Sequence, residues 1–350
     1  MLHLKRISVE NMQNRQNLMQ SRFWAKVKDR MGWHPLAFQI TWQDRRDTLL
    51  LFIQNPANQY SWAYVPWAPT FSVPEEYRGL FLEQLSQHLL GFLPEECIFI
   101  RYDLPWKSPY QEELPPSEHL RELRMNFGTR QKNLRKAPTD VQPPDTQVLD
   151  ISKDSDQLLR EMRSKTRYNI RLARKKGVRV TDARFDRLDE WYRMYTETAR
   201  RNGISLHSYE NFKKLLEVEA KEDLPNTDIH LLIAEKDHTP LAGMLLALHG
   251  KTATYLYGAS HSEQRNLMPT YRLQWEAIRL AQHNRCTYYD LFGIPPADQP
   301  GHPMYGLYRF KTGFGGYSFH RQGCWDYPID RKAYLQYAGQ EPVGTAYHRR

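Results

Sequence analysis

The sequence has few cysteines and no long apolar run, and these absences exclude several classes of protein. Its three cysteines, Cys97, Cys286 and Cys324, are far apart and form no Cys-x-x-Cys pair, which argues against a disulfide framework or a zinc site. We expect buried, reduced thiols. No apolar stretch approaches the roughly 20 residues of a membrane-spanning helix, and the first residues lack the apolar core of a signal peptide. The expected location is the cytoplasm.

The sequence also lacks the common motifs of nucleotide binding and covalent catalysis. Lys311 and Thr312 are not preceded by the glycine of a P-loop, and neither Gly-x-Ser-x-Gly nor His-Glu-x-x-His occurs. An acyl-CoA transferase would need a glycine-rich pyrophosphate loop before a helix, but the corresponding residues 264–269 read QRNLMP. We therefore expect no metal and no resident cofactor.

What the chain does have is length, aromatic side chains and an excess of basic residues. Its 350 residues suit about two domains, and aromatic residues make up 13% of it, enough to build packed cores. The formal net charge is +9, from 49 Lys and Arg against 40 Asp and Glu. Such an excess favours an anionic partner, namely nucleic acid, a phosphorylated substrate or an anionic membrane surface.

The positive charge is concentrated on either side of a proline-rich segment, residues 137–146. Residues 160–180 contain nine basic side chains and one acidic one, and residues 121–136 contain six and one. A helix that is merely solvated usually mixes both signs, so we interpret the first stretch as an anion-binding helix. A solvated helix face is the alternative. The proline-rich segment itself is typical of a linker or domain crossing.

Periodicity predicts the same order of elements twice: helices, an antiparallel meander, a helix and a strand. We expect helices at 14–30, 74–91, 155–176, 186–202, 208–221 and 270–283, with shorter ones from Ser117 and at the end of the chain. We expect strands at 36–42, 48–54, 60–65, 97–103, 178–183, 229–235, 241–249, 253–259, 288–292 and 318–325. Gly177 is placed to end the basic helix in a left-handed conformation. The repeated order predicts two similar α/β units.

Several segments of the chain resemble one known family. They are SKTRYNIRLARKKGV at 164–178, DVQPPDTQVLDIS at 140–152, YYDLFGI at 288–294, YGLYRFKTGFGG at 305–316 and LMQSRFWAKVKDRMGW at 18–33. Together they resemble the Fem family (FemABX) of tRNA-dependent aminoacyltransferases, which build the interpeptide bridges of peptidoglycan. The resemblance spans nearly the whole chain, with the segments in the right order.

The resemblance implies an α/β (α+β) fold of two tandem GNAT-like domains, the fold of acyl-CoA N-acyltransferases. The first domain is expected at 1–145, with the C-terminal segment 318–350 packing back on it. The second is expected at 146–317 and contains the basic helix 155–177. Some members of the family carry a helical hairpin in the second domain. This chain has no room for one between Tyr209 and Ile229, so it is similar to the shorter members.

The resemblance also implies the reaction and the partners. An amino acid passes from aminoacyl-tRNA to an amine of the stem peptide of a lipid-linked (lipid II) or UDP-linked muropeptide, with peripheral contact at the inner face of the membrane. The aminoacyl ester is already activated, so the enzyme needs to position the amine, stabilise an oxyanion and assist the leaving ribose. Two alternatives stay open: an N-acyltransferase that uses acyl-CoA or another carrier, and a non-catalytic RNA-binding module.

Site residues follow from the matching motifs. By resemblance, Lys311 binds the 3′ end of the RNA and stabilises charge during transfer. Phe310 is expected to pack beside the terminal adenosine or the lysine stem, and a plain core role is the alternative. Lys28, with Lys26 as its neighbour if the register slips, matches a lysine that contacts the diphosphate of the carrier. Tyr257 matches a tyrosine of the substrate cleft.

The chain departs from the family pattern at one substrate-binding position. Shorter members carry an arginine and, four residues later, a tyrosine that hold the diphosphate and peptide, whereas His207 and Asn211 stand there in this chain. Tyr209, between them, is a candidate substitute, and a lipid-linked acceptor or another amine therefore stays open beside the nucleotide-linked one. The residues expected to bind tRNA are Arg167, Arg171, Arg174, Lys175 and Lys176, some of which are alternatively structural caps.

Overall fold

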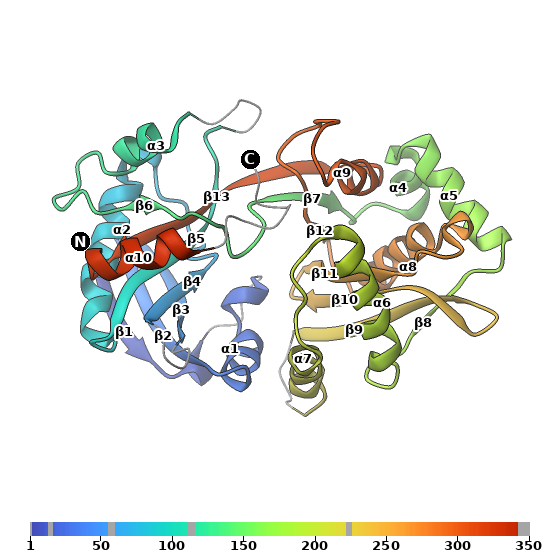
Figure 1. Ribbon diagram of the computed structural model, residues 1–350, viewed down its shortest axis with the longest axis horizontal. Helices are drawn as coiled ribbons and strands as arrows, with labels where there is room; N and C mark the ends of the chain where they lie inside the picture. The colour runs from blue at the N-terminus through green and yellow to red at the C-terminus, as the bar shows by residue number, and fades with distance from the viewer. Residues whose placement is uncertain (1, 13–16, 55–59, 111–115, 222–225, 342–350) are drawn as a thin grey trace. The chain divides into compact units, whose positions relative to one another are not determined.

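The computed structural model describes residues 2–12, 17–54, 60–110, 116–221 and 226–341, and these form two compact units. Of the described residues, the first unit contains 2–144 and 320–341, and the second contains 145–319 (Figure 1). The chain thus leaves the first unit after Pro144, forms the second, and returns to the first. Figure 1 shows this return as the red α10 among the blue and cyan elements.

The first unit is built on a mostly antiparallel sheet. Its strand order is β1 (Leu2–Ile7), β2 (Trp33–Trp42), β3 (Arg45–Gln54), β4 (Ser61–Pro66), β5 (Cys97–Lys107) and β13 (Tyr317–Pro328), and the short β6 (Arg135–Lys136) also pairs with β13. Among the strand pairs of this unit that the structure describes, only β4 and β5 run parallel, and the chain between them forms the long helix α2 (Arg78–Leu89). This crossover is the feature that places a helix across the sheet.

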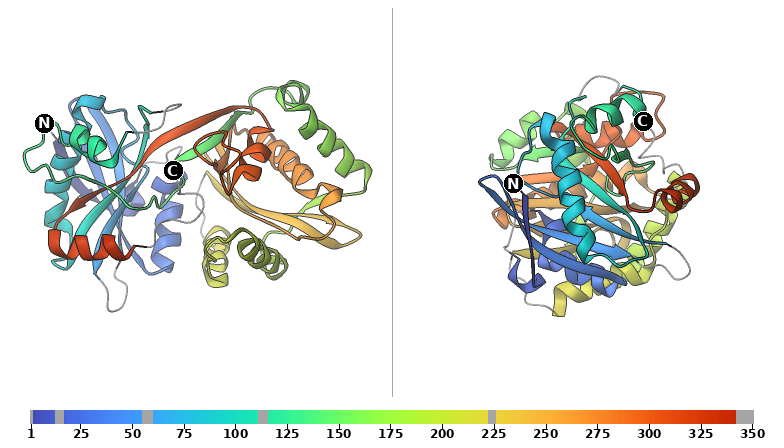
Figure 2. Two further views of the ribbon diagram at one scale, coloured as in Figure 1. Left: turned by 45° about the horizontal axis from the view of Figure 1, so that its top comes forward. Right: turned by 90° about the vertical axis from the view of Figure 1, so that its left-hand side faces the viewer.

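Helices cover both faces of this sheet (Figure 2). They are α1 (Arg22–Arg30), α2 (Arg78–Leu89), α3 (Glu118–Met125) and α10 (Arg331–Gln340), with 3₁₀ turns at Val9–Asn11, Leu18–Gln20, Glu75–Tyr77 and Leu90–Phe92. On one face, Phe81 and Leu85 of α2 pack into the core with Ile100 of β5. On the other face, the ring of Phe99 lies 5.4 Å from that of Tyr334 in α10. Neighbouring residues of β5 therefore face opposite layers, as the strand alternation requires.

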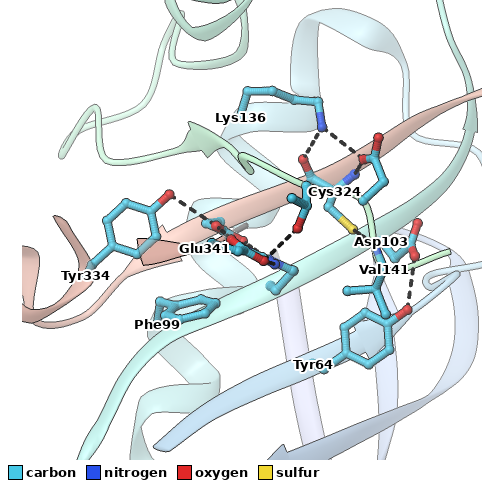
Figure 3. A network of polar contacts seen from close by, with 12 residues as sticks. Tyr64, Phe99, Asp103, Lys136, Val141, Cys324, Tyr334 and Glu341 are labelled. Atoms are coloured by element: carbon cyan, nitrogen blue, oxygen red, sulfur yellow. Dashed lines mark hydrogen bonds and ion pairs between the residues drawn. The ribbon is translucent and has the colours of Figure 1, made fainter. Parts of the chain in front are cut away.

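The returning segment is fixed to the first unit by a buried ionic network (Figure 3). Arg101 of β5 is 1% exposed and donates two hydrogen bonds of 2.8 Å to Asp326 of β13. It also donates to both carboxylate oxygens of Glu341, at 2.5 and 2.9 Å. The Tyr334 hydroxyl donates to Asp326 at 3.1 Å. Because Arg101 and Asp326 are buried, removing one of them would leave the other charge without this partner in the interior.

The second unit repeats the arrangement. Its strand order is β7 (Asp145–Asp150), β12 (Tyr288–Gly293), β11 (Thr252–Ser260), β10 (Thr239–His249), β9 (Thr227–Lys236) and β8 (Arg179–Asp182). Here too one pair, β11 and β12, is parallel, and a long helix connects the two strands. The sequence prediction of two similar α/β units is therefore confirmed.

Helices again lie on both faces of the sheet. They are α4 (Ser155–Glu161), α5 (Ser164–Lys175), α6 (Leu188–Asn202), α7 (Tyr209–Lys221), α8 (Pro269–His283) and α9 (Tyr305–Thr312), with a 3₁₀ turn at Arg265–Leu267. Ile170 of α5 and Ile278 of α8 share a core with Met244 of β10. On the opposite face, a Cβ on Gly243 would lie 2.7 Å from the ring of Trp191 in α6, so glycine is needed for this close approach.

The prediction of one continuous basic helix over 155–176 is wrong, because two helices occupy that range. Met162 and Arg163 are extended, and the N–H of Arg163 donates to the Gly313 carbonyl at 2.9 Å. The Arg167 guanidinium caps the end of α4 by donating to the carbonyls of Leu159, Arg160 and Met162. These contacts supply the hydrogen bonds that the interrupted helix loses. Gly177 does end α5 at φ +84°, with the bond from Val178 N–H to the Ala173 carbonyl that is typical of a Schellman motif.

Other boundaries also differ from the sequence predictions. The helix expected at 14–30 begins at Arg22, where the Ser21 hydroxyl accepts the Trp24 N–H, and residues 13–16 lie outside the described residues. The strands β1, β6 and β7 and the helix α9 were not predicted. The proline-rich segment contains the start of β7 at Asp145.

Candidate active site

Lys311 is a buried lysine in the last turn of α9. Its side chain is 4% exposed, and its Nζ donates to the Gly293 carbonyl at 2.7 Å and lies 5.2 Å from the centre of the Tyr255 ring. Burial lowers the pKa of Lys311 to about 7, although the Asp290 carboxylate acts in the opposite direction. The side-chain amine of Lys311 therefore has a pKa near neutrality and lies at the end of the parallel strands β11 and β12.

The end of β12 is shaped to receive this amine. Phe292 has a φ of +61°, which is uncommon for a non-glycine residue, and its N–H donates to Asp290 Oδ1 at 2.8 Å. The same carboxylate oxygen accepts the Thr146 hydroxyl of β7. The β7–β12 register shifts between Asp290 and Gly293. The carboxylate thus stabilises the bulge from which the Gly293 carbonyl meets Lys311.

Phe310, the neighbour of Lys311, has a packing role. Its ring lies 5.0 Å from that of Tyr271 in α8 and 5.3 Å from that of Phe314, and it packs on the core of the second unit. These contacts agree with the core alternative that we gave for Phe310. They also fix the orientation of α9, and therefore of Lys311.

The glycines that follow Lys311 allow α9 to approach α5 and β7 closely. A Cβ on Gly313 would lie 2.6 Å from the Thr166 hydroxyl of α5. Gly316 has a φ of +76°, and a Cβ there would lie 2.1 Å from the Val148 carbonyl. The segments 164–178 and 305–316, which we singled out separately in the sequence, therefore pack against each other.

A second cluster, which is aromatic, surrounds Tyr257 on the opposite face of the sheet. The ring of Tyr257 lies 5.0 Å from Phe212, 5.5 Å from His207 and 6.3 Å from Tyr195, all with edge-to-face geometry. Burial raises the pKa of the Tyr257 phenol, so this hydroxyl is neutral at physiological pH. Of the residues that the sequence suggested for substrate binding, the structure brings Tyr257 and His207 together.

A β-bulge explains why Tyr255 and Tyr257 belong to different clusters. Residues two apart in a regular strand share a face. Here Tyr257 pairs with Leu245 and Tyr255 with Leu246, so Leu256 is an extra residue in β11. Tyr255 consequently packs on the core beside α8 and faces Lys311, whereas Tyr257 faces α6 and α7.

Tyr209 and Asn211 lie near the start of α7 but make different contacts. The Tyr209 ring lies 5.3 Å from that of Tyr192, and a hydrogen bond to Asp189 raises the pKa of its phenol to about 12. The backbone N–H of Asn211 donates to Ser208 at the beginning of the helix. The structure shows no direct contact of either side chain with Tyr257 among its described ring contacts and hydrogen bonds.

Lys28 belongs to α1 of the first unit and is flanked by two indoles. Its Nζ lies 5.5 Å from the Trp24 ring and 5.0 Å from the Trp33 ring. Burial lowers its pKa to about 8. Lys26, by contrast, lies 3.4 Å from the Glu10 carboxylate. Lys28 is therefore the better placed of the two to meet an anion, because no carboxylate among the described residues pairs with it.

The basic side chains of α5 divide into two groups. Arg167 is half-buried and caps α4, as described above, and Lys176 donates to the Asn266 carbonyl at 2.8 Å. Arg171, Arg174 and Lys175 are exposed. These three, together with the exposed Lys165 at the start of α5, present a basic surface that is open to a large anionic ligand.

No group of three or more potential metal-ligating side chains occurs among the described residues. All three cysteines are buried and unbridged. The segment 264–269 forms the 3₁₀ turn before α8, with Gln264 and Met268 at positive φ. Two left-handed residues thus occur in the loop where an acyl-CoA transferase would use glycines.

The comparisons with known proteins agree with this architecture. The model of the FemAB family matches residues 9–231 and 219–340. The chain is 23% identical over 386 residues to the lipid II:glycine glycyltransferase of Staphylococcus epidermidis, covering 91% of this chain and 89% of that protein. It is 22% identical over 393 residues to that of Staphylococcus aureus strain USA300, with the same coverage. The chain belongs to the FemAB family.

Two solved structures are similar to the fold of this FemAB protein. The crystal structure of FemX superposes with a TM-score of 0.73 at 18% identity and covers 96% of this chain and 100% of that one. A tandem GNAT protein from the clavulanic acid biosynthesis pathway gives a TM-score of 0.52 at 11% identity, covering 94% and 98%. The expected tandem GNAT-like fold is confirmed. As a FemAB protein, the chain is a transferase of peptidoglycan synthesis.

Several residues around Lys311 and Tyr257 were missed by sequence reasoning. Gly293 accepts a hydrogen bond from Lys311, Asp290 interacts with its charge, and Thr146 donates to Asp290. Phe212 and Tyr195 lie against Tyr257. The carboxylate of Asp290, inside the largely apolar stretch 288–294, is a signal that could have identified this residue. None of the helices in the described part of the chain is long and apolar enough to cross a membrane.

Proposed function

We propose that this protein transfers an aminoacyl group from aminoacyl-tRNA to an amine of a peptidoglycan stem peptide. The observation that carries the proposal is Lys311, a buried amine with a pKa of about 7, held by the Gly293 carbonyl in a FemAB protein. The glycyltransferase relatives act on lipid II by their names, so we favour a lipid-linked acceptor over a UDP-linked one. The reaction would then take place at the cytoplasmic face of the membrane.

Lys311 suits this reaction because its charge can change near neutral pH. The acceptor amine forms a bond with the ester carbonyl carbon, and the carbonyl oxygen becomes an oxyanion that the Lys311 ammonium stabilises. When the carbon–oxygen bond to the ribose breaks, Lys311 gives its proton to the leaving ribose oxygen. It then takes the proton that the amine loses. Gly293 occupies one of the three N–H donors of the ammonium, which leaves two for the substrate.

The acceptor and donor are assigned to separate groups of residues. We assign the muropeptide to Tyr257 and His207, with Tyr209 and Asn211 nearby, and its carrier diphosphate to Lys28. The desolvated Lys28 ammonium would regain a charged partner from the diphosphate. We assign the tRNA to the exposed cations Arg171, Arg174 and Lys175 of α5, where backbone contacts make binding strongly dependent on salt.

The experiment is a transfer assay with a mixed pool of charged tRNA and purified lipid-linked muropeptide, in which the added mass is measured. Lys311→Met should reduce transfer by about 100-fold or more, with an unchanged circular dichroism spectrum. Lys251→Met, which changes an exposed lysine of the same unit, should retain wild-type transfer. Full activity of Lys311→Met would contradict the proposed role.

Acyl-CoA is the alternative donor, because the tandem GNAT protein shares this fold. Two measurements test this alternative: binding of acetyl-CoA in a calorimetric titration, and transfer from acetyl-CoA in the assay described above. We expect neither binding nor transfer, since segment 264–269 lacks the glycines of a pyrophosphate loop. Stoichiometric binding of acetyl-CoA would favour the alternative.

A further inference from the structure

The helix α3 of the first unit presents apolar side chains to solvent. Leu120 is 48% exposed, Leu123 is 55% exposed and Phe127, just after the helix, is 79% exposed. Their spacing of three and four residues places them on one side of the helix. We call these three residues the α3 ridge. Single exposed leucines are ordinary, but a contiguous apolar surface usually marks an interaction site.

The inward side of α3 already has its partners: Met125 packs in the core of the first unit, and polar side chains beside it are hydrogen-bonded. The Glu122 carboxylate accepts the Lys136 N–H at 2.9 Å. The Asn126 side chain accepts the Leu134 N–H at 2.9 Å and donates to the Leu134 carbonyl at 2.8 Å. A rotation of α3 that buried the ridge would leave these groups without partners. The orientation of the ridge toward solvent is therefore fixed by hydrogen bonds.

Basic side chains lie in α3 and in the loop that follows the ridge. Arg124, Arg130 and Lys132 are exposed, and none of them pairs with a carboxylate of the described residues. The Glu83 carboxylate positions the loop that carries the last two, since it accepts the N–H groups of Arg130 and Gln131 at 2.8 and 2.7 Å. The result is an apolar ridge beside cations that lack an acidic partner within the described part of the chain.

We propose that the α3 ridge and these three cations dock the protein on an anionic lipid bilayer. Leucine and phenylalanine side chains at this spacing can enter the boundary between headgroups and acyl chains, and neighbouring Arg and Lys attract anionic headgroups. RNA would use the cations and could stack on Phe127, but it offers nothing to Leu120 and Leu123. A second copy of this chain would bring the same cations together and repel. The surface therefore fits a membrane best.

This inference goes beyond the proposed reaction, since binding to lipid needs no substrate. Its consequence, that docking brings the enzyme to a lipid-linked acceptor, rests on the proposed function. A protein without a spanning helix in its described part would gain access to such an acceptor through a peripheral surface of this kind.

The test is sedimentation of the full-length protein with vesicles of phosphatidylcholine alone or mixed equally with phosphatidylglycerol. The wild type should bind the mixed vesicles more tightly, and added salt should weaken this binding. The variant Leu123→Ser with Phe127→Ser should bind at least about tenfold more weakly. The variant Arg130→Glu with Lys132→Glu should also bind about tenfold more weakly.

Matched controls keep the result specific. Leu335→Ser changes an equally exposed leucine of α10 in the same unit, and Lys5→Glu with Arg6→Glu reverses exposed charges of β1; both should bind as the wild type does. The proposal is overturned if the wild type does not bind the mixed vesicles, or if the ridge variant binds them equally well. It is also overturned if the ridge variant loses only tRNA binding or only self-association measured by ultracentrifugation.

Transfer activity separates this proposal from the proposed function. The ridge variant should transfer to a water-soluble muropeptide as the wild type does, but should be slower with lipid-linked acceptor in vesicles. Vesicle binding that depends on the ridge, in a protein that transfers to neither acceptor, would support docking and contradict the proposed reaction.

Discussion

Lys311 occupies a position that disfavours its own charge. Burial lowers its pKa from 10.5 to about 7, whereas the unfolded chain keeps the higher value. The unfolded protein therefore binds more protons than the folded protein between pH 7 and 10.5, and stability rises with pH across this window. The cost of holding the ammonium is fully present below pH 7. A position that costs stability in this way is typical of a functional residue.

We predict that Lys311→Met stabilises the protein while it abolishes transfer. The free energy of unfolding should rise by about 1 kcal/mol or more at pH 6, because methionine needs no hydration in this buried site. The gain should shrink as the pH rises toward 10. Urea unfolding at pH 6 and pH 9.5 measures it, and a gain that is equal at both pH values would mean that Lys311 is not titrating.

Asp290 offers a variant that changes charge but keeps geometry. In Asp290→Asn the amide oxygen still accepts the Phe292 N–H and the Thr146 hydroxyl, so the bulge in β12 should persist. The loss of the negative charge should lower the pKa of Lys311 further, by about one unit. An NMR titration of the lysine Nζ measures this shift, and the alkaline limb of the pH–transfer profile should move with it. Asp290→Ala, which also loses the acceptor, should in addition be less stable.

At the scale of the elements, the α4–α5 junction separates structural arginines from ligand-binding ones. We predict that Arg167→Met lowers the free energy of unfolding by about 1–3 kcal/mol, because three carbonyls lose their donor. Arg171→Met on the same helix should leave stability unchanged. It should instead weaken tRNA binding and reduce the slope of its salt dependence by about one. Thermal unfolding measures the change in stability, and tRNA binding at several salt concentrations measures the change in slope. If the two variants behave alike in both measurements, the separation into structural and ligand-binding arginines is wrong.

The helices and strands also show which features of the fold could be predicted from the sequence and which could not. Most strands and helices and the end of α5 at Gly177 follow from local pattern and turn chemistry, so they were predictable, whereas β1, β6, β7 and α9 were not. The break at Met162 depends on Gly313, about 150 residues away in the chain, and periodicity contains no such information. The bulge at Leu256 likewise depends on the pairing with β10. It decides which tyrosine faces Lys311, so the sequence motif alone selected Tyr257 and missed Tyr255.

At the scale of the whole molecule, the first unit is discontinuous in the chain. Its strand β13 pairs with β5 and β6, and Asp326 and Glu341 neutralise the buried Arg101. Among the described residues, the second unit is instead formed by one continuous stretch, 145–319. The two units should therefore differ in whether they can fold when they are separated from the rest of the chain.

We predict that the fragment 145–319 folds cooperatively, whereas the fragment 1–144 does not. The shorter fragment would expose the edge of β5 and leave Arg101 without its carboxylates, and breaking a buried ion pair costs about 3–5 kcal/mol. That loss is a large part of the stability of a domain of this size. Joining residues 317–341 to the fragment 1–144 through a glycine–serine linker should restore cooperative unfolding. Urea unfolding monitored by tryptophan fluorescence measures this, and cooperative unfolding of 1–144 alone would show that the returning segment is dispensable.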